Sequence, residues 1–294
     1  MKNDDPHDSV LHYSAFTADG KGGNPAGVVL DARGMDDAAM QRVAADLGYS
    51  ETAFLFPRAD APRDEAAFDI RYFSPLAEVS FCGHATIAAT VAHAQQHGAG
   101  GRLLHTRAGA VRVEVDQADV DGPFVATLTS VEPRVTALDA ADLEAILSAL
   151  RWRREDLDPA LAPAVAYAGA SHPVIATATR ARLAQLDYDF DALGAILARR
   201  GWITVNLVWR ENATSFHARN PFPTGGVVED PATGAAAAAL GAYLADRRAL
   251  PAGRAFTIRQ GEDMGRPSRI LVSVPENLRE GVRVAGTAVR LAAD

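Results

Sequence analysis

The chain has 294 residues, of which 48% are hydrophobic, and its 29 basic and 37 acidic residues give a net charge of −8. This length suits one large domain or two medium ones, and such an acidic chain repels nucleic acid and anionic membranes. Cys82, the single cysteine, excludes an internal disulfide, and no apolar run approaches the ~20 residues of a membrane span. We therefore expect a cytoplasmic protein that acts on a small molecule, with neither nucleic acid nor membrane as a partner.

The first 120 residues alternate short apolar runs with one strongly periodic segment. Strand character is expected within 10–30, which a Gly-Gly-Asn-Pro cluster at 22–25 interrupts. A helix is predicted over 36–47, with Gly48 as its C-terminal cap. Further strands are predicted at 50–56, 68–73, 102–106, 111–115 and 124–128, and a further helix over 87–97. The acidic, turn-rich segment 117–123 is the expected boundary between domains 1–120 and 121–294.

The second half follows a similar plan. Helices are predicted over 142–150, 189–200 and 235–246, and strands at 164–167, 173–178, 202–209, 214–218, 255–259, 269–274 and 282–291. Alanines at 235–239 leave the last helix without a polar face, so we expect a sheet to enclose it. The run Gly83-His84-Ala85-Thr86 opens a comparable small-residue helix in the first half. This similarity between the two halves predicts two related α/β units, each a sheet wrapped around a central helix.

Two loops, 83–86 and 231–234, each lead into the N-terminus of one of these small-residue helices. A helix N-terminus presents unpaired N–H groups and about half a positive charge, so a carboxylate between two of them needs no arginine. We therefore expect the two loops to face each other around an anion. Gly83 and Gly234 also fit ordinary tight turns, because glycine is the default turn residue.

Glu51 is the strongest single candidate for a catalytic residue, because it directly precedes the largely apolar run Thr52-Ala53-Phe54-Leu55-Phe56. Burial disfavours the carboxylate and raises its pKa from ~4.3 toward neutrality, where a general acid or base works best. An exposed strand glutamate is the plainer alternative. His84 fits either substrate contact or packing at a helix start, and Asp230 fits either a substrate acceptor or a helix cap. Cys82 is either a nucleophile or a small buried hydrophobe.

Other common catalytic signatures are missing from the sequence. It contains no GxxxxGK[ST] phosphate loop, no HExxH and no GxSxG, and its eight histidines show no tight metal-ligand spacing. We therefore expect catalysis without a metal and without a cofactor.

Five motifs resemble, in their order along the chain, those of the PhzF-like family, which is named for phenazine biosynthesis. They are Gly23-Asn24-Pro25-Ala26-Gly27-Val28, Ser50-Glu51-Thr52-Ala53-Phe54, Cys82-Gly83-His84-Ala85-Thr86, Glu229-Asp230-Pro231-Ala232-Thr233-Gly234 and Gln260-Gly261 with Met264-Gly265-Arg266-Pro267-Ser268. The resemblance implies a diaminopimelate-epimerase-like α/β (α+β) fold. In that fold two pseudo-symmetric halves each curl a mixed sheet around a central helix, with the site in the cleft between. It also implies a homodimer, and a final strand at 282–291 that returns to the first half.

Carried over residue by residue, the resemblance implies Glu51 as the catalytic acid/base. It implies that the substrate-binding residues are Asn24, Gly83, His84, Asp230, Gly234 and Ala235. Ala235 stands where the phenazine enzyme has a serine, which removes a hydroxyl from the predicted pocket. This leaves open whether the phenazine precursor, an amino-hydroxy-cyclohexadiene carboxylate, is the substrate.

We predict a cofactor-independent isomerase that moves a proton on a small unsaturated or amino carboxylic acid. Two alternatives stay open. An amino-acid racemase or epimerase of the two-thiol kind needs a second cysteine, which this chain lacks, so only a Glu51/Cys82 pair could serve. A binding protein that has kept the pocket and lost catalysis is the other alternative, and Ala235 is the feature that keeps it open.

Overall fold

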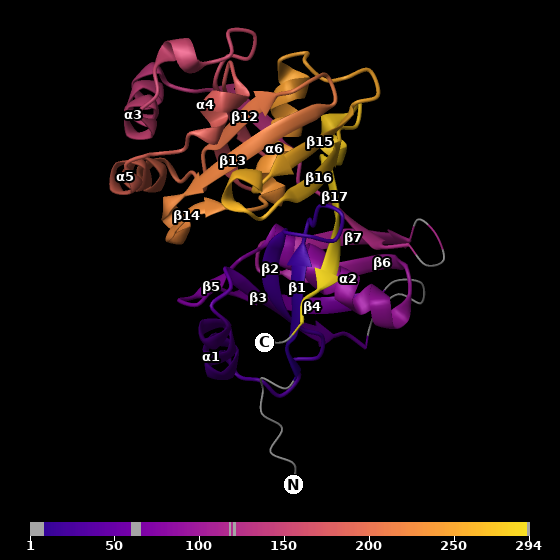
Figure 1. Cartoon of the computed structure of the whole chain (residues 1–294). Helices are drawn as coiled ribbons and strands as arrows, with labels where there is room; N and C mark the ends of the chain where they lie inside the picture. Colours follow the sequence, from indigo (N-terminus) through magenta and orange to yellow (C-terminus); the bar gives the residue numbers. More distant parts are fainter. Residues whose placement is uncertain (1–8, 60–65, 118, 120–121, 293–294) are drawn as a thin grey trace. The chain divides into compact units, whose positions relative to one another are not determined.

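The computed structural model describes residues 9–59, 66–117, 119 and 122–292. The chain divides into two compact units, which are coloured along the sequence in Figure 1. One consists of Met1–Thr129 with Ala285–Asp294, and the other of Ser130–Val284. The predicted boundary between residues 120 and 121 falls outside the described residues.

The strands of the first unit close into a ring. These strands are β1 (Leu11–Ala15), β2 (Asn24–Val29), β3 (Glu51–Pro57), β4 (Ala66–Phe73), β5 (Glu78–Val79), β6 (Gly100–Thr106), β7 (Gly109–Gln117), β8 (Phe124–Thr129) and β17 (Arg283–Arg290). Pairing runs β1-β2-β3-β4-β6-β7-β8-β17 and back to β1, with β5 alongside β4. The sheet is mixed, because β2 with β3 and β4 with β6 are parallel pairs. The last strand of the chain thus pairs with the first.

The helix α2 (Gly83–His97) fills this ring, and its residues from His84 to Ala92 are all buried. Five of its 15 residues are alanine and two are threonine, which lets strands approach it from every side. The helix α1 (Asp37–Leu47) packs on the outer face through Met40 and Val43, which meet Phe54 and Phe73. Strand β3 is therefore covered on both faces, which accounts for an apolar run in place of alternation.

The second unit repeats the arrangement around α6 (Gly234–Asp246). Its strands are β9 (Arg134–Ala137), β10 (Ala164–Tyr167), β11 (Ser171–Ala176), β12 (Asn206–Arg210), β13 (Ser215–Phe222), β14 (Val227–Asp230), β15 (Ala255–Gln260) and β16 (Ser268–Ser273). Pairing runs β9-β10-β11-β12-β13-β15-β16, with β14 along the end of β13. All residues from Ala236 to Leu244 are buried, so α6 is enclosed on every side. This confirms the predicted α/β fold of two curled mixed sheets, each around a central helix.

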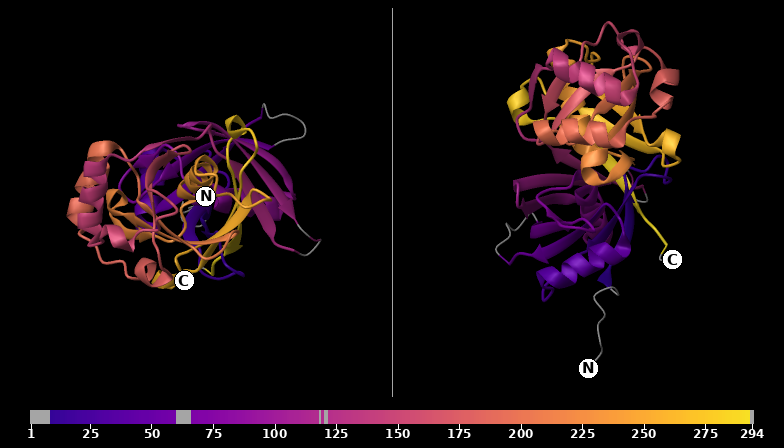
Figure 2. Two further views of the ribbon diagram at one scale, coloured as in Figure 1. Left: turned by 90° about the horizontal axis from the view of Figure 1, so that it is seen from above. Right: turned by 90° about the vertical axis from the view of Figure 1, so that its left-hand side faces the viewer.

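Three further helices cover the outside of the second unit. The helices α3 (Ala140–Leu150) and α5 (Phe190–Arg200) lie side by side, as Figures 1 and 2 show, and α4 (Arg180–Ala184) is shorter. Their apolar faces join Ile175 and Leu207 of the sheet and two tryptophans, Trp152 and Trp202, in one buried cluster. In the part of the chain that is described, no helix is both long and apolar enough to cross a bilayer.

Some predicted boundaries were wrong for identifiable reasons. The strand predicted at 202–209 begins at Asn206, because Gly201 and Trp202 form the C-terminal cap of α5. Gly201 adopts a left-handed conformation there, and the Trp202 N–H donates to the carbonyl of Leu197. The strand β14 was missed, since Val227 and Val228 are exposed and leave no alternating pattern.

Candidate active site

Three of the residues considered from the sequence meet at the N-terminus of α2. Glu51 is the first residue of β3, Cys82 is the N-cap of α2, and His84 lies in its first turn. The Glu51 Oε2 atom lies 3.4 Å from His84 Nε2, and Cys82 Sγ lies 3.3 Å from His84 Nδ1. Ser50 Oγ also lies 3.2 Å from His84 Nε2. The fold therefore surrounds one imidazole with a carboxylate, a thiol and a hydroxyl.

The cluster is enclosed but not sealed. Cys82 and His84 are 7% and 6% exposed, whereas the Glu51 side chain keeps 16% exposure. Of these three residues, Glu51 is thus the most exposed to a ligand.

Glycines of the first motif allow the strands to pack tightly behind Glu51. Gly23 has a φ of +79°, and a Cβ there would lie 2.5 Å from the carbonyl oxygen of Ala15. A Cβ on Gly27 would come within 2.8 Å of the side chain of Thr52, on the neighbouring strand. Asn24 is buried at the start of β2, the strand that pairs in parallel with β3. The motif residues therefore fix the position of the strand that carries Glu51.

The two central helices begin differently from the others that are described. Side chains cap the N-termini of α1, α3, α4 and α5, through Asp36, Asp139, Thr179 and Asp189. Neither Cys82 at α2 nor Thr233 at α6 makes such a capping bond. The N-cap side chains therefore leave the first-turn N–H groups of both central helices uncapped, which suits an anion ligand.

In the second unit, Asp230 is the last residue of β14 and is 8% exposed. Its Oδ2 atom accepts a hydrogen bond of 2.6 Å from Thr233 Oγ1, and its backbone carbonyl accepts one of 2.7 Å from Gln260 Nε2. The Gln260 Oε1 atom in turn accepts from the Thr233 N–H at 3.2 Å. Thr233, not Asp230, is the N-cap of α6. The side chain of Gln260 thus holds the loop between β14 and α6 in place, because it hydrogen-bonds to both Asp230 and Thr233.

The predicted site residues fall into two groups. Asn24, Glu51, Gly83 and His84 belong to the first unit, where Glu51 begins β3 and Gly83 and His84 lie in the first turn of α2. The other three, Asp230, Gly234 and Ala235, belong to the second unit and lie at or just before the start of α6. Ala235 is half-buried in the first turn of that helix.

Sequence reasoning did not single out Gln260 as a site residue. It also missed a buried polar chain in the second unit. His172 Nδ1 lies 2.9 Å from Thr204 Oγ1, which donates to Asn220 Oδ1 at 3.0 Å, and Asn220 is the strand partner of Asp230. Burial lowers the pKa of His172 to about 4. Gln260 stands in one of the five motifs and could have been found there, whereas a lone histidine in a strand gives no signal.

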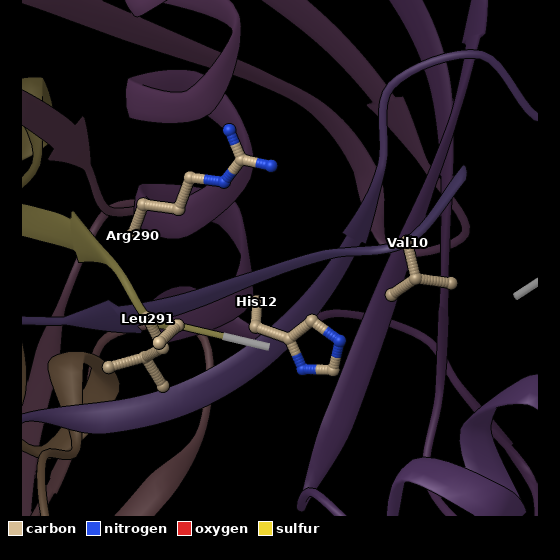
Figure 3. A pocket seen from close by; sticks show the side chains of 5 residues that line it. Val10, His12, Arg290 and Leu291 are labelled. Atoms are coloured by element: carbon tan, nitrogen blue, oxygen red, sulfur yellow. The ribbon is translucent and has the colours of Figure 1, made fainter. Parts of the chain in front are cut away.

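A separate pocket of about 410 Å³ lies in the first unit, as Figure 3 shows. It is lined by Val10, His12, Arg290, Leu291 and Ala292. His12 Nδ1 lies 3.1 Å from the hydroxyl of Tyr49, so this ring is engaged in the surrounding structure. None of the predicted site residues lines this pocket.

Comparison with known proteins agrees with this arrangement. The family model of the phenazine biosynthesis-like proteins matches residues 13–293. The isomerase YddE of Escherichia coli is 35% identical over 293 residues, with 96% of each chain covered. The trans-2,3-dihydro-3-hydroxyanthranilate isomerase of Pseudomonas aeruginosa is 30% identical over 259 residues, covering 87% of this chain and 86% of the relative. The structure of a predicted epimerase from the same species has a TM-score of 0.82 at 29% identity, with 96% of both chains covered. The protein belongs to the phenazine biosynthesis-like family, and it is an isomerase.

Proposed function

We propose that this isomerase moves a proton between two positions of a small unsaturated or amino carboxylic acid, with Glu51 as the only proton carrier. The observation that carries the proposal is the half-enclosed Glu51 carboxyl group beside His84 at the uncapped N-terminus of α2. The Glu51 carboxylate removes a proton from a carbon next to the conjugated system, and the C–H electron pair enters that system. The resulting carboxylic acid returns the proton to another carbon on the same face.

The surroundings of Glu51 support this assignment. When His84 Nε2 carries a proton, the ring can donate it toward the carboxylate, which orients the carboxylate oxygens. The first-turn N–H groups of α2 are suited to a substrate carboxylate, because each charge-assisted hydrogen bond contributes ~1.5–3 kcal/mol. At α6, the N–H groups that follow Thr233 are suited to a carboxylate in the same way.

The alternative of a Glu51/Cys82 racemase is disfavoured by distance. Two carriers on opposite faces of one carbon stand roughly 6–7 Å apart, since each must approach the carbon to ~3–3.5 Å. Ligand atoms of Glu51, Cys82 and His84 all lie within 4.8 Å of one another. Such close spacing leaves no room for a substrate carbon between the thiol and the carboxyl group, and this favours a single carrier.

Wash-in of deuterium from solvent tests the proposal on a panel of compounds, so the substrate need not be identified first. The panel should contain small unsaturated and amino carboxylic acids, with trans-2,3-dihydro-3-hydroxyanthranilate among them. We expect deuterium in at least one compound, and Glu51→Gln should slow its incorporation by ~10² to 10⁴ because the titrating proton is lost. Glu114→Gln, at an exposed glutamate of the same unit, is the matched control. Near-normal incorporation by the Glu51 variant would refute its role, and binding without any incorporation would favour the non-catalytic alternative.

A further inference from the structure

We propose that Glu51, Cys82 and His84 form a three-ligand site for a thiophilic divalent cation, Zn²⁺, and that its binding blocks the isomerase. A carboxylate, a thiolate and an imidazole are the three ligand types that zinc uses in proteins. These three residues converge from the start of β3 and the start of α2.

Two of the three pairs of ligand atoms lie near the separations that zinc needs, and the third pair, from Glu51 and Cys82, lies within 4.8 Å. Bond lengths of ~2.0–2.3 Å in a tetrahedron place neighbouring ligand atoms ~3.3–3.6 Å apart. Glu51 Oε2 lies 3.4 Å from His84 Nε2, and Cys82 Sγ lies 3.9 Å from the same nitrogen. Sγ is nearer to Nδ1, at 3.3 Å, so coordination through Nε2 requires a small rotation of the ring or of the thiol.

Binding of Zn²⁺ at this site balances both protons and charge. Zn²⁺ replaces the thiol proton of Cys82, which leaves to solvent, and the thiolate and the Glu51 carboxylate together cancel the charge of the ion. The positive end of α2 opposes a cation, and the two anionic ligands offset this. Three protein ligands leave the fourth position open to water, as in zinc sites that are not purely structural. Ser50 Oγ, 3.2 Å from His84 Nε2, adds a hydroxyl beside the three ligands.

Occupancy has one direct consequence for catalysis. A Glu51 carboxylate bound to zinc through one oxygen is a much weaker base, so Zn²⁺ at this site inhibits the reaction. The binding half of the proposal stands on geometry alone. The inhibition half rests on the proposed role of Glu51, so the two are measured separately.

Binding is measured on the whole protein, with CoCl₂ as a spectroscopic probe and ZnCl₂ as competitor. Co²⁺ should bind at one ion per chain and give a thiolate-to-cobalt charge-transfer band, which Zn²⁺ abolishes. Cys82→Ser should remove the band, and His84→Ala or Glu51→Gln should weaken binding by about 10–100-fold or more. His97→Ala is the matched control, because it removes an exposed imidazole from the same helix and should change nothing. Circular dichroism establishes that each variant is folded.

The binding half is wrong if folded wild-type protein gives no charge-transfer band, or if the band survives in both the His84 and the Glu51 variants. In the activity half, Zn²⁺ should inhibit deuterium wash-in at the concentrations that displace Co²⁺. Inhibition of Cys82→Ser, relative to its own metal-free rate, should need at least about 10-fold more Zn²⁺. Tight binding of Zn²⁺ without inhibition would overturn the inhibitory role, and with it the claim that Glu51 carries the proton, while leaving the metal site itself in place.

Discussion

At Cys82 a thiol lies 3.3 Å from His84 Nδ1, so its part in catalysis can be decided by one substitution. We predict that Cys82→Ala keeps most of the isomerase activity, in contrast to the ~10² to 10⁴ loss expected for Glu51→Gln. The reason is spacing, because a thiol this close to the Glu51 carboxyl group cannot serve the opposite face of a substrate. Initial rates of deuterium incorporation in the same buffer give the comparison. An equal loss in both variants, with the fold intact, would restore the racemase alternative.

Among the elements, the loop after β15 shows how a glycine can support a site without contacting a ligand. Gly261 and Gly265 both have a φ of +74°, so alanine is strained at either position. The two positions differ in the room that they leave for a Cβ. A Cβ on Gly261 would lie 2.2 Å from the carbonyl oxygen of Arg266 and 2.8 Å from that of Pro231, whereas a Cβ on Gly265 would have nothing within 4 Å. Pro231 follows Asp230 directly, so Gly261 packs against the predicted substrate loop.

We therefore predict that Gly265→Ala lowers the free energy of unfolding by ~1–3 kcal/mol, the ordinary cost of a left-handed non-glycine residue. Gly261→Ala should cost more than this, because two backbone carbonyls must also move. It should also weaken binding of the panel compound that incorporates deuterium, while Gly265→Ala should not. Urea unfolding and calorimetric titration measure the two effects. Equal stability of the two variants would mean that the loop relaxes freely around Gly261.

The same elements show what the sequence can and cannot predict. The enclosure of α6 follows from alanines on all its faces, since composition reports local surroundings directly. The link from Gln260 to Asp230 joins residues 30 positions apart, and no local pattern encodes it. The convergence of Cys82 and Glu51 on His84 depends likewise on how α2 is seated inside its ring of strands. Each residue of the cluster could be suspected from the sequence, but the distances between these residues could not be predicted from it.

At the scale of whole units, the buried His172 should make stability depend on pH. Burial lowers its folded pKa to about 4 from an ordinary 6.5, so the unfolded chain binds more protons between those two values. Stability should therefore fall as pH drops from 6.5 to 4, by up to about 3 kcal/mol from this one group. All three tryptophans, Trp152, Trp202 and Trp209, belong to the same unit as His172, so tryptophan fluorescence reports on its unfolding.

The test of this dependence is urea unfolding at several pH values between 4 and 7. His172→Asn keeps an N–H near the position of Nδ1, where it can still donate to Thr204, but it does not titrate. The variant should lose stability less steeply than the wild-type protein as the pH falls. The exposed His97→Asn is the control and should follow the wild-type curve. If the His172 variant also follows that curve, protonation of His172 is not coupled to unfolding.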